Sequence, residues 1–497
     1  VGPYVPMAPD HFLISHDTSG IHCAPETVSV SAKNLDSSTT TGYTGTITLD
    51  TQLPSSTGTW SLLTGKGFFN DATDNNGEAT FTFDAEDEGV VVFPFYYPDG
   101  AATFNIDVFD NANSTIRDKE LDPEHNITFA ASGFTVTAEA LTDLSSIDNN
   151  IPTQIAGSAF NLHLTAYGTS ANDPQCGIIE TYTADKEITL VTTYINHSDG
   201  TVAATGGGKI EFSDGRAVVS TIYKDVGRIQ LTFRDDGTPA INGTSNSFVV
   251  KPHSYLISLS DGETGSDYEA NSATDSIYKK AGEPFTVTVT ARSFDESTTP
   301  NFGNESSPSV TVDLSHLLAR PNNEDDGFTG VPGMLNGTWS NHINNSGRFS
   351  GDYSFNEVGI INLTASIDYL GTGIVTTTLS SIGRFTPASL SLTVINDGKF
   401  ISANTDGALN FTYVGQPFSY DPADRPSLKA TAFNASSPAT RTSNYSGAWR
   451  KLNAASIEFT EPTSDEMQHG TLKPNGTSTR MVLTYAQGYD GFRDLKN

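Results

Sequence analysis

Cysteine, basic residues and long apolar runs are all scarce in this sequence, and each scarcity excludes a class of protein. Two cysteines in 497 residues cannot form the disulfide framework that holds small secreted domains together. Lys and Arg number 27 against 58 Asp and Glu, a formal charge of −31, and no basic cluster offers a surface for nucleic acid. The longest apolar run, residues 90–97, is too short to span a bilayer, so we expect no direct membrane insertion.

The chain nevertheless contains enough apolar material to build cores. Hydrophobic residues make up 36% of it, and 44 glycines bring the composition into the range of globular proteins. The acidic chain is therefore not a disordered tail. Because a single core stops growing near about 250–300 residues, the length predicts three or four domains.

Short stretches of alternating polar and apolar residues recur along the chain. Examples rich in Thr, Ser and Val are Thr27–Ala32, Thr286–Ala291 and Ser389–Val394. Alternation with a period of two buries one face of a strand and leaves the other face polar. Clusters of Asn, Asp, Gly and Ser separate these stretches and are typical of turns. The pattern predicts an all-β fold of tandem immunoglobulin-like antiparallel β-sandwich domains in an elongated array.

Two sequence elements repeat and divide the chain into units. A glycine element occurs at residues 156–160 (AGSAF), 281–285 (AGEPF) and 414–418 (VGQPF). A turn element, with an acidic residue two positions before a glycine, occurs at residues 87–89, 225–227 and 357–359. Since an immunoglobulin-like sandwich needs roughly 100 residues plus its loops, we predict domains at 1–130, 131–251, 252–385 and 386–497.

The fourth predicted domain is shorter than its repeats require. The spacing of the two elements in the second and third domains places the late turn of the fourth near or beyond residue 490, and no such element is visible there. We therefore expect the fourth domain to be incomplete. Either the chain is a fragment, or a segment from elsewhere completes the open sheet edge.

Several stretches resemble the MshQ-like proteins associated with the mannose-sensitive haemagglutinin type IV pilus (MSHA) of Gram-negative bacteria. The stretches are residues 9–34, 176–183 (CGIIETYT), 281–303 (with AGEPF and TTPNFG) and 383–447 (with FTYVGQPF and NYSG). The resemblance implies an exported, surface-associated protein linked to pilus biogenesis or adhesion. One departure is the segment 405–410 (TDGALN), which stands where family members often carry a cysteine, so any role of such a cysteine is in doubt.

Motifs that would indicate an enzyme are missing from the sequence. No G-x-S-x-G nucleophile motif occurs, and neither cysteine lies in a motif that would pair it with a base. The glycine run Gly206–Lys209 lacks both the Ser or Thr after its lysine and the earlier glycine that a phosphate-binding loop requires. We therefore expect no catalytic residues, no cofactor-binding residues and no enzymatic activity.

Acidic loops are the candidates for a metal site. Asp71, Asp74, Asn76 and Glu78 lie in one turn, and residues 322–327 (NNEDDG) form a second loop of the same kind. Oxygen ligands of this type suit calcium. Neither loop has the D-x-D-x-D-G spacing, and the same residues are typical of any turn. The alternatives are a calcium site at one of these loops and a solvated hairpin.

The few Trp and Cys side chains each allow more than one role. Trp60 and Trp449 are expected to anchor cores, whereas Trp339 lies among polar residues and is a candidate for ligand binding. Cys23 and Cys176 fall in neighbouring predicted domains. A disulfide would clamp these domains if the Cα atoms come within about 7 Å; otherwise each cysteine is a small buried hydrophobe. Because a single inter-domain bridge is uncommon, the sequence favours separate cysteines.

The leading hypothesis is a non-enzymatic extracellular protein of the bacterial surface, secreted or pilus-associated. A rod of immunoglobulin-like domains would serve adhesion or display, with other pilus or cell-surface proteins as partners. One alternative is a glycan-binding module in which Trp339 and the acidic calcium loops form the site. The other is a filament subunit that self-associates, its incomplete fourth domain accepting a strand from a neighbour.

Overall fold

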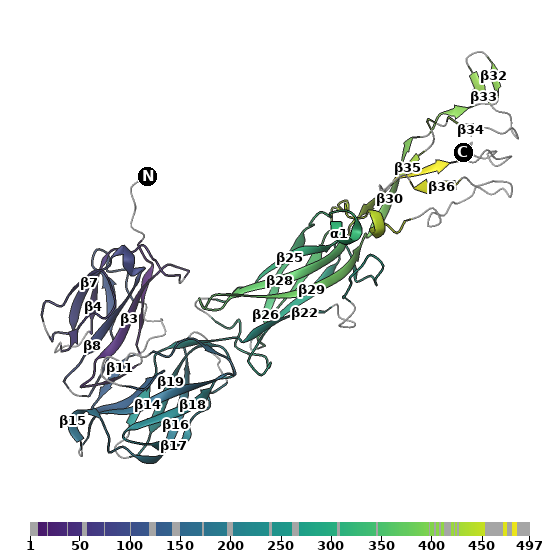
Figure 1. The fold of residues 1–497 in the computed structure, drawn as a ribbon. Coiled ribbons are helices and arrows are strands. Elements are labelled where there is room, and N and C mark those ends of the chain that lie inside the picture. The colour runs from purple at the N-terminus through teal and green to yellow at the C-terminus, as the bar shows by residue number, and fades with distance from the viewer. Residues whose placement is uncertain are drawn as a thin grey trace.

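The protein is a chain of four β-domains, of which the first two lie side by side and the others extend away from the second (Figure 1). The computed structural model describes residues 8–452, with gaps, together with residues 471–474 and 480–484. The gaps fall at residues 17, 37, 52–56, 74, 100, 119–125, 142–149, 171–172, 196–201, 238–240, 261–267, 306–308, 344–345, 397, 402–403, 407–408, 412–418, 422 and 425–426.

Domain 1 consists of two facing four-stranded sheets and a small third sheet. The sheet orders are β1-β3-β8-β5, β10-β4-β7-β6 and β2-β11-β9. The elements are β1 (His11–Ser15), β2 (Ser19–Ile21), β3 (Glu26–Lys33), β4 (Thr46–Asp50), β5 (Thr59–Trp60), β6 (Phe68–Asn70), β7 (Glu78–Thr82), η1 (Ala85–Asp87), β8 (Val90–Tyr96), β9 (Ala102–Phe104), β10 (Asp107–Asp110) and β11 (Ile127–Ala130).

Domain 2 pairs a four-stranded sheet with a six-stranded one. In the first, β14 pairs with β12, β15 and β18; the second has the order β13-β21-β19-β16-β17, with β20 also pairing with β19. The elements are β12 (Ser132–Thr137), β13 (Gln154–Ile155), β14 (Ala159–Ser170), β15 (Asp173–Ile178), β16 (Ala184–Tyr194), β17 (Gly208–Phe212), β18 (Arg216–Ile222), β19 (Gly227–Asp235), β20 (Ile241–Thr244) and β21 (Phe248–Lys251).

Domain 3 has the most regular topology of the four. Its sheets have the orders β22-β24-β27-β26 and β23-β29-β28-β25, which match the ABED and GFC arrangement of an immunoglobulin-like sandwich. The elements are β22 (Ser254–Ser260), β23 (Lys279–Lys280), β24 (Pro284–Arg292), β25 (Asp313–Arg320), α1 (Asn323–Asp326), β26 (Leu335–Ile343), β27 (Arg348–Phe355), β28 (Gly359–Asp368) and β29 (Ile374–Thr386).

Domain 4 is described only in part. Its described strands form the sheet β30-β35-β37-β36 and the pairs β31-β34 and β32-β33. The elements are β30 (Ser389–Asn396), β31 (Phe400–Ile401), β32 (Asn404–Asp406), β33 (Leu409–Phe411), β34 (Ser419–Tyr420), β35 (Ser427–Phe433), η3 (Gly447–Trp449), β36 (Thr471–Pro474) and β37 (Arg480–Thr484). The late turn expected near residue 490, and with it the predicted incompleteness of this domain, lies outside the described residues.

The predicted alternation is what builds the cores. On β3, Val28, Val30 and Ala32 are fully buried between the sheets of domain 1, while the intervening residues face outward. The same alternation buries Val287 and Val289 in domain 3. The chain therefore has the all-β fold of tandem immunoglobulin-like domains that the sequence predicts. The described residues include no helix with the length and hydropathy of a membrane-spanning segment.

The described strand pairing corrects one of the sequence repeats. The predicted boundary after residue 385 falls inside β29, whose Thr386 pairs with Lys280 of β23. The turn at residues 87–89 is not equivalent to those at 225–227 and 357–359. Gly89 precedes β8, which pairs with β3, and it occupies the position of the glycines before β18 and β27. This equivalence appears in three matching backbone bonds, Ala32 N–H to Gly89, Ala166 N–H to Gly215 and Ala291 N–H to Gly347.

Candidate functional site: the joints between domains

The glycine elements at 156–160 and 281–285 lie at the end of one domain where the next domain docks, and the copy at 414–418 lies outside the described residues. The N–H of Phe294 donates to the carbonyl of Ala156 at 2.7 Å, and the N–H of Ala435 donates to that of Ala281 at 2.7 Å. Both following glycines have left-handed backbones, with φ of 77° at Gly157 and 87° at Gly282. A Cβ at Gly282 would come within 2.9 Å of the Ala435 nitrogen. Glycine therefore serves here both for its φ and for the close approach of the next domain.

The acidic residue of the turn element completes the joint between domains 2 and 3. One oxygen of the Asp225 carboxylate accepts the N–H of Asn301 at 3.0 Å and that of Val226 at 2.9 Å. Asp225 is fully buried, and its second oxygen has no hydrogen-bond partner in the described structure. Beside it, Lys224 forms an exposed ion pair with Asp295 across the same boundary. The buried cores of domains 2 and 3 are continuous through this joint.

The joint between domains 3 and 4 repeats the arrangement with a longer acid. The Glu357 carboxylate accepts the N–H groups of Ser443 at 2.7 Å and Asn444 at 3.1 Å. The amide of Asn444 in turn donates to the carbonyls of Val331 and Val358, each at 3.0 Å. Each acid thus caps the same loop of the domain that follows it. In both cases the contact is to backbone N–H groups, which a carboxylate binds more strongly than a neutral acceptor does.

A tryptophan and the second acidic loop also take part in the joint between domains 3 and 4. The indole N–H of Trp449 donates to Asp326 at 3.0 Å, and Trp449 is buried against Val358 and Ile360. The guanidinium of Arg320 pairs with Asp325 at 2.8 Å. The loop at residues 322–327 is therefore used to cap α1 and to receive domain 4, with Asn322 as the N-cap. Trp449 is buried as expected, but at a joint rather than inside one domain.

Burial at the joint between domains 2 and 3 shifts the acidity of two carboxyl groups. Desolvation raises the pKa of Asp225 to about 6, against the opposing effect of its hydrogen bonds from Asn301 and Val226. Desolvation likewise raises the pKa of Glu305 to about 7, with a further contribution from the Asp225 charge. Glu305 accepts hydrogen bonds from the Tyr369 hydroxyl and from the Gly303 N–H. Burial therefore raises the pKa values of two acids at this joint toward neutral pH.

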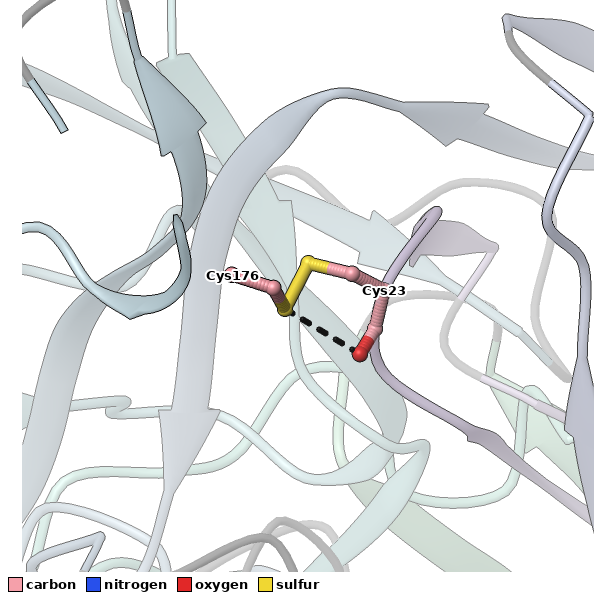
Figure 2. The surroundings of a disulfide bond; sticks show 2 residues. All are labelled: Cys23 and Cys176. Atoms are coloured by element: carbon pink, nitrogen blue, oxygen red, sulfur yellow. Dashed lines mark hydrogen bonds between the residues drawn. A yellow bond between two sulfur atoms is a disulfide. The ribbon is translucent and has the colours of Figure 1, made fainter. Parts of the chain in front are cut away.

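Domains 1 and 2 are joined in a different way, by a disulfide. Cys23 and Cys176 are bonded with an S–S distance of 2.03 Å and a Cα–Cα distance of 5.9 Å, so the preference for separate cysteines is wrong. Figure 2 shows the bridge, with the Cys176 sulfur 3.2 Å from the Cys23 carbonyl oxygen. The Gln230 amide also donates to the His16 carbonyl at 3.0 Å, and the Thr244 N–H donates to the Ser19 hydroxyl at 3.0 Å.

The candidate calcium loop is partly engaged in holding its own turn. Asp71 accepts the N–H of Trp60 at 3.0 Å, and Asn76 accepts the N–H of Glu78 at 3.0 Å. Asp74 lies outside the described residues. Among the residues that the structure does describe, no group of three or more His, Cys, Asp or Glu side chains is arranged to hold a metal ion. Calcium binding at this loop stays a prediction.

The candidate ligand-binding tryptophan packs on the side of a core. Trp339 on β26 is half-buried against Phe349 and Tyr353, and its indole N–H donates to the Val312 carbonyl at 2.7 Å. Its polar atom is thus already used inside domain 3. A role in ligand binding stays a prediction. Trp60 is a core anchor as expected, with 2% of its surface exposed.

For the joints after domains 2 and 3, the sequence indicated the residues on the preceding domain but not those on the domain that follows. It identified the glycine element and the turn element, but not that the residues facing them belong to the next domain. The available signal was the related pair TPNFG (299–303) and TSNYS (442–446), which places Asn301 and Asn444 at matching positions. Domain 2 has Thr181 at this position, and its joint to domain 1 uses the disulfide instead.

Three consecutive stretches of the chain match domains of one family. Residues 113–247 match the first Ig-like domain of DUF6701, a domain of unknown function. Residues 251–352 match the second domain of DUF6701, and residues 357–496 match the third. The three matches follow the family's own order and correspond largely to structural domains 2, 3 and 4. No curated protein sequence matches the chain.

Solved structures of tandem β-domain proteins are similar at low identity. The Yersinia pseudotuberculosis adhesin InvE is 12% identical over 61% of this chain and 67% of its own, with a TM-score of 0.24. The D0-D1 domain of intimin is 14% identical over 48% of this chain and 96% of its own, with a TM-score of 0.15. The ICAM-5 D1-D4 ectodomain fragment is 10% identical over 85% and 98%, with a TM-score of 0.22. At these values the likenesses say nothing of function.

Proposed function

Because the chain carries the three DUF6701 domains in tandem, we propose that it is a non-enzymatic, extracellular protein of the bacterial surface. Domains 2, 3 and 4 form a semi-rigid rod, with domain 1 beside domain 2, and the rod displays inter-strand loops for adhesion. Other cell-surface proteins are the proposed partners. The more specific proposal is association with the mannose-sensitive haemagglutinin type IV pilus, supported by the resemblance of residues 9–34, 176–183, 281–303 and 383–447 to MshQ-like proteins.

The observation that carries the proposal is the equivalence of two successive joints. Ala156 with Asp225, and Ala281 with Glu357, receive matching backbone bonds from the domain that follows. A linker that only connects domains would leave them free to rotate, and few contacts would cross the boundary. Here the contacts are buried, and the cores of domains 2 and 3 are continuous. Such joints favour a protein that must hold its domains in line.

Small-angle scattering of the purified chain tests the rod. A compact globule of this length has a radius of gyration of about 23 Å, by the scaling of folded chains. We expect a value well above that, with a distance distribution skewed toward long vectors. A symmetric distribution with the compact value would overturn the rod.

Labelling of intact cells tests the surface location. An antibody against domain 3 should stain unpermeabilised bacteria that produce the full-length protein. Shearing the pili from these cells should release the stain together with the major pilin. Stain that appears only after lysis would overturn the surface location, and stain that stays on sheared cells would overturn the association with the pilus.

Adhesion is tested with coated beads. Beads coated with the purified chain should be retained by host-cell layers more than beads coated with the heat-denatured chain. Equal retention would overturn adhesion.

A further inference from the structure

Domain 1 carries the same kind of docking loop that domains 3 and 4 use to contact the domain before them. We call residues 34–43, 293–302 and 434–445 the receiving loops of domains 1, 3 and 4. In domains 3 and 4 the receiving loop donates N–H groups to the glycine element and to the acidic residue of the preceding domain. The joints described above leave the receiving loop of domain 1 without a role.

Matching backbone hydrogen bonds show that the three receiving loops are built alike. In each, the N–H of a threonine donates to the carbonyl of an alanine near the end of the strand before the loop. The pairs are Thr40 to Ala32 at 2.8 Å, Thr299 to Ala291 at 3.1 Å and Thr442 to Ala432 at 2.9 Å. A second bond inside each loop, of 2.9 Å, joins Asn34 to Ser38, Ser293 to Ser297 and Asn434 to Thr440. By these bonds Leu35 corresponds to Phe294 and Ala435, and Gly42 corresponds to Asn301 and Asn444.

The segment that leads into domain 1 also matches the linkers of the two joints. Each linker opens with a proline, at Pro9, Pro252 and Pro387. The residue after the proline donates its N–H to the end of the strand before the receiving loop: Asp10 to Lys33 at 2.7 Å, His253 to Arg292 at 2.8 Å and Ala388 to Phe433 at 2.8 Å. At the joints, the proline directly follows the last strand of the preceding domain, β21 or β29. The linker at Pro9 therefore has the form that follows another domain.

At the two joints the preceding domain covers the receiving loop. The N–H groups of Phe294 and Ala435 donate to carbonyls of that domain, each at 2.7 Å. Asn301 and Asn444, which lie beside its acidic residue, are only 2% and 1% exposed. Burial at these positions is thus a mark of the docked state.

The receiving loop of domain 1 is open at the corresponding positions. Leu35 is 83% exposed, and its N–H has no acceptor in the described part of the chain. Gly42 is half-buried, although its two counterparts are buried. The loop therefore presents an N–H donor at the place where, in two other domains of this chain, a carbonyl of the preceding domain is bound.

Asp36 provides a charged contact at the edge of this loop. It accepts the N–H of Ser38 at 3.1 Å, just as Asp295 accepts the N–H of Ser297 at 3.3 Å. Asp295 also pairs with Lys224 of the preceding domain. Asp36 has no ion-pair partner among the described residues. An exposed pair contributes little energy, but it favours a partner with a basic residue at this place.

The open loop lies at the end of domain 1 that is remote from the disulfide to domain 2. β3 begins at Glu26, three residues after Cys23, and ends at Lys33, directly before the loop. A strand of this length spans about 25 Å. A domain docked on the loop therefore extends the array beyond domain 1.

We propose that the receiving loop of domain 1 docks a further β-sandwich domain, which directly precedes Pro9 in the full-length polypeptide. That domain presents a backbone carbonyl to the Leu35 N–H, as Ala156 and Ala281 do at their joints. It places an acidic turn beside Gly42 and a basic residue near Asp36. The occupant belongs to the same polypeptide, because the linker at Pro9 matches those of both joints. Neither adhesion nor association with a pilus enters this inference.

Hydrogen exchange in two forms of the protein tests the proposal. One is the full-length polypeptide purified from the bacterial surface, and the other is the 497-residue chain. We expect the amides at 34–43 to exchange at least tenfold more slowly in the full-length polypeptide. The amides at 76–78, at the other end of the β4–β7 pair, are the internal control and should not change.

Three outcomes would overturn the proposal. The first is equal exchange at 34–43 in the two forms. The second is a full-length polypeptide with far fewer residues before Pro9 than the roughly 100 that a sandwich needs. The third is slow exchange in the 497-residue chain that depends on its concentration, because a second copy would then be the occupant.

Two substitutions in the full-length polypeptide locate the contact. Gly42→Trp places a large side chain where the counterparts are buried, so it should return exchange at 34–43 to the rate of the 497-residue chain. Leu35→Trp is the matched control, because Phe294 at the same position stays 60% exposed at its joint; it should keep the slow exchange. Exchange at 28–32 on β3 shows whether domain 1 stays folded, and if it does not, Gly42→Arg takes the place of the tryptophan. Equal effects of the substitutions at 42 and 35 would overturn the assignment to this loop.

Discussion

The carboxylate of Asp225 in domain 2 accepts a hydrogen bond of 3.0 Å from the backbone N–H of Asn301 in domain 3. Asp225 lies at the end of domain 2 that faces domain 3, and the N–H group of Asn301 belongs to domain 3. This contact therefore exists only when the two domains are docked. Glu357 makes the same kind of contact with Ser443 and Asn444 one domain further on. The two joints can therefore be loosened or tightened by changing a single acid.

Replacing Asp225 separates the effect of its charge from that of its acceptor oxygen. Asp225→Ala leaves the Asn301 N–H unpaired in a buried place, at a cost of about 1–3 kcal/mol. Asp225→Asn keeps an acceptor and removes the cost of burying a charge. We expect hydrogen exchange of the amides at 299–303 to speed up at least tenfold in Asp225→Ala, and to stay near the wild-type rate in Asp225→Asn.

The neighbouring ion pair provides the control for this experiment. Lys224 and Asp295 are 61% and 42% exposed, so Lys224→Ala should cost less than about 0.5 kcal/mol and leave the exchange at 299–303 unchanged. If Lys224→Ala and Asp225→Ala speed the exchange equally, the joint depends on surface charge and not on the buried contact.

Acidification should stabilise the joint between domains 2 and 3. The pKa of Asp225 is raised to about 6 and that of Glu305 to about 7, both by burial. A group with a raised pKa contributes stability that is present in full below its ordinary pKa and is lost as the pH rises through the folded-state value. Between pH 8 and pH 5 the joint should therefore gain roughly 2–4 kcal/mol from these two groups, which hydrogen exchange at 299–303 would measure.

The general charge of the chain also falls on acidification, and the double variant Asp225→Asn/Glu305→Gln isolates that background. The variant should lose most of the pH dependence at 299–303 while keeping the background trend elsewhere. A slope as steep in the variant as in the wild type would show that the two acids are not its source.

The strand pattern was predictable because it is local. Alternation at Thr27–Ala32 needs only the identity of neighbouring residues to say that Val28 and Val30 are buried, and they are. The docking of domains is not local. The glycine element was visible as a repeat. Its sequence does not indicate that the Ala156 carbonyl accepts a hydrogen bond from the Phe294 N–H, because that contact depends on how two folded domains pack against each other.

The cysteines illustrate the same limit from the other side. Pairing across 153 residues requires that Cys23 and Cys176 come within bonding distance, which is a property of the joint between domains 1 and 2. Single disulfides between domains are uncommon, so the sequence favoured separate cysteines. The structure shows instead that Cys23 and Cys176 are bonded.

Removing the disulfide should free domain 1 from domain 2. Cys23→Ser/Cys176→Ser opens a loop of 153 residues, and losing a native disulfide typically costs about 2–5 kcal/mol, more for longer loops. The remaining contacts include the buried hydrogen bond from Gln230 to His16 and a small apolar cluster to which both domains contribute, with Ile21 from domain 1 and Tyr167 from domain 2. We expect a lower unfolding midpoint in calorimetry and a broader distance distribution in scattering. Wild-type protein treated with reductant is the matched control and should behave as the double variant does. Unchanged midpoints in both would mean that the noncovalent contacts alone hold the joint.

Trp449 should stabilise the joint between domains 3 and 4 through its ring and through its indole N–H. The side chain is 2% exposed and donates to Asp326 at 3.0 Å. Trp449→Ala should lower the free energy of unfolding at this joint by about 3–5 kcal/mol, and Trp449→Phe by about 1–2 kcal/mol through the lost hydrogen bond. Faster exchange of the amides at 442–447, which include those bound to Glu357, would report the loosening.

Trp60→Phe is the matched control, because the Trp60 indole N–H donates to the Gly77 carbonyl at 3.0 Å inside domain 1. It should destabilise domain 1 and leave the exchange at 442–447 unchanged, whereas equal effects of the two substitutions there would place the action of Trp449 outside the joint.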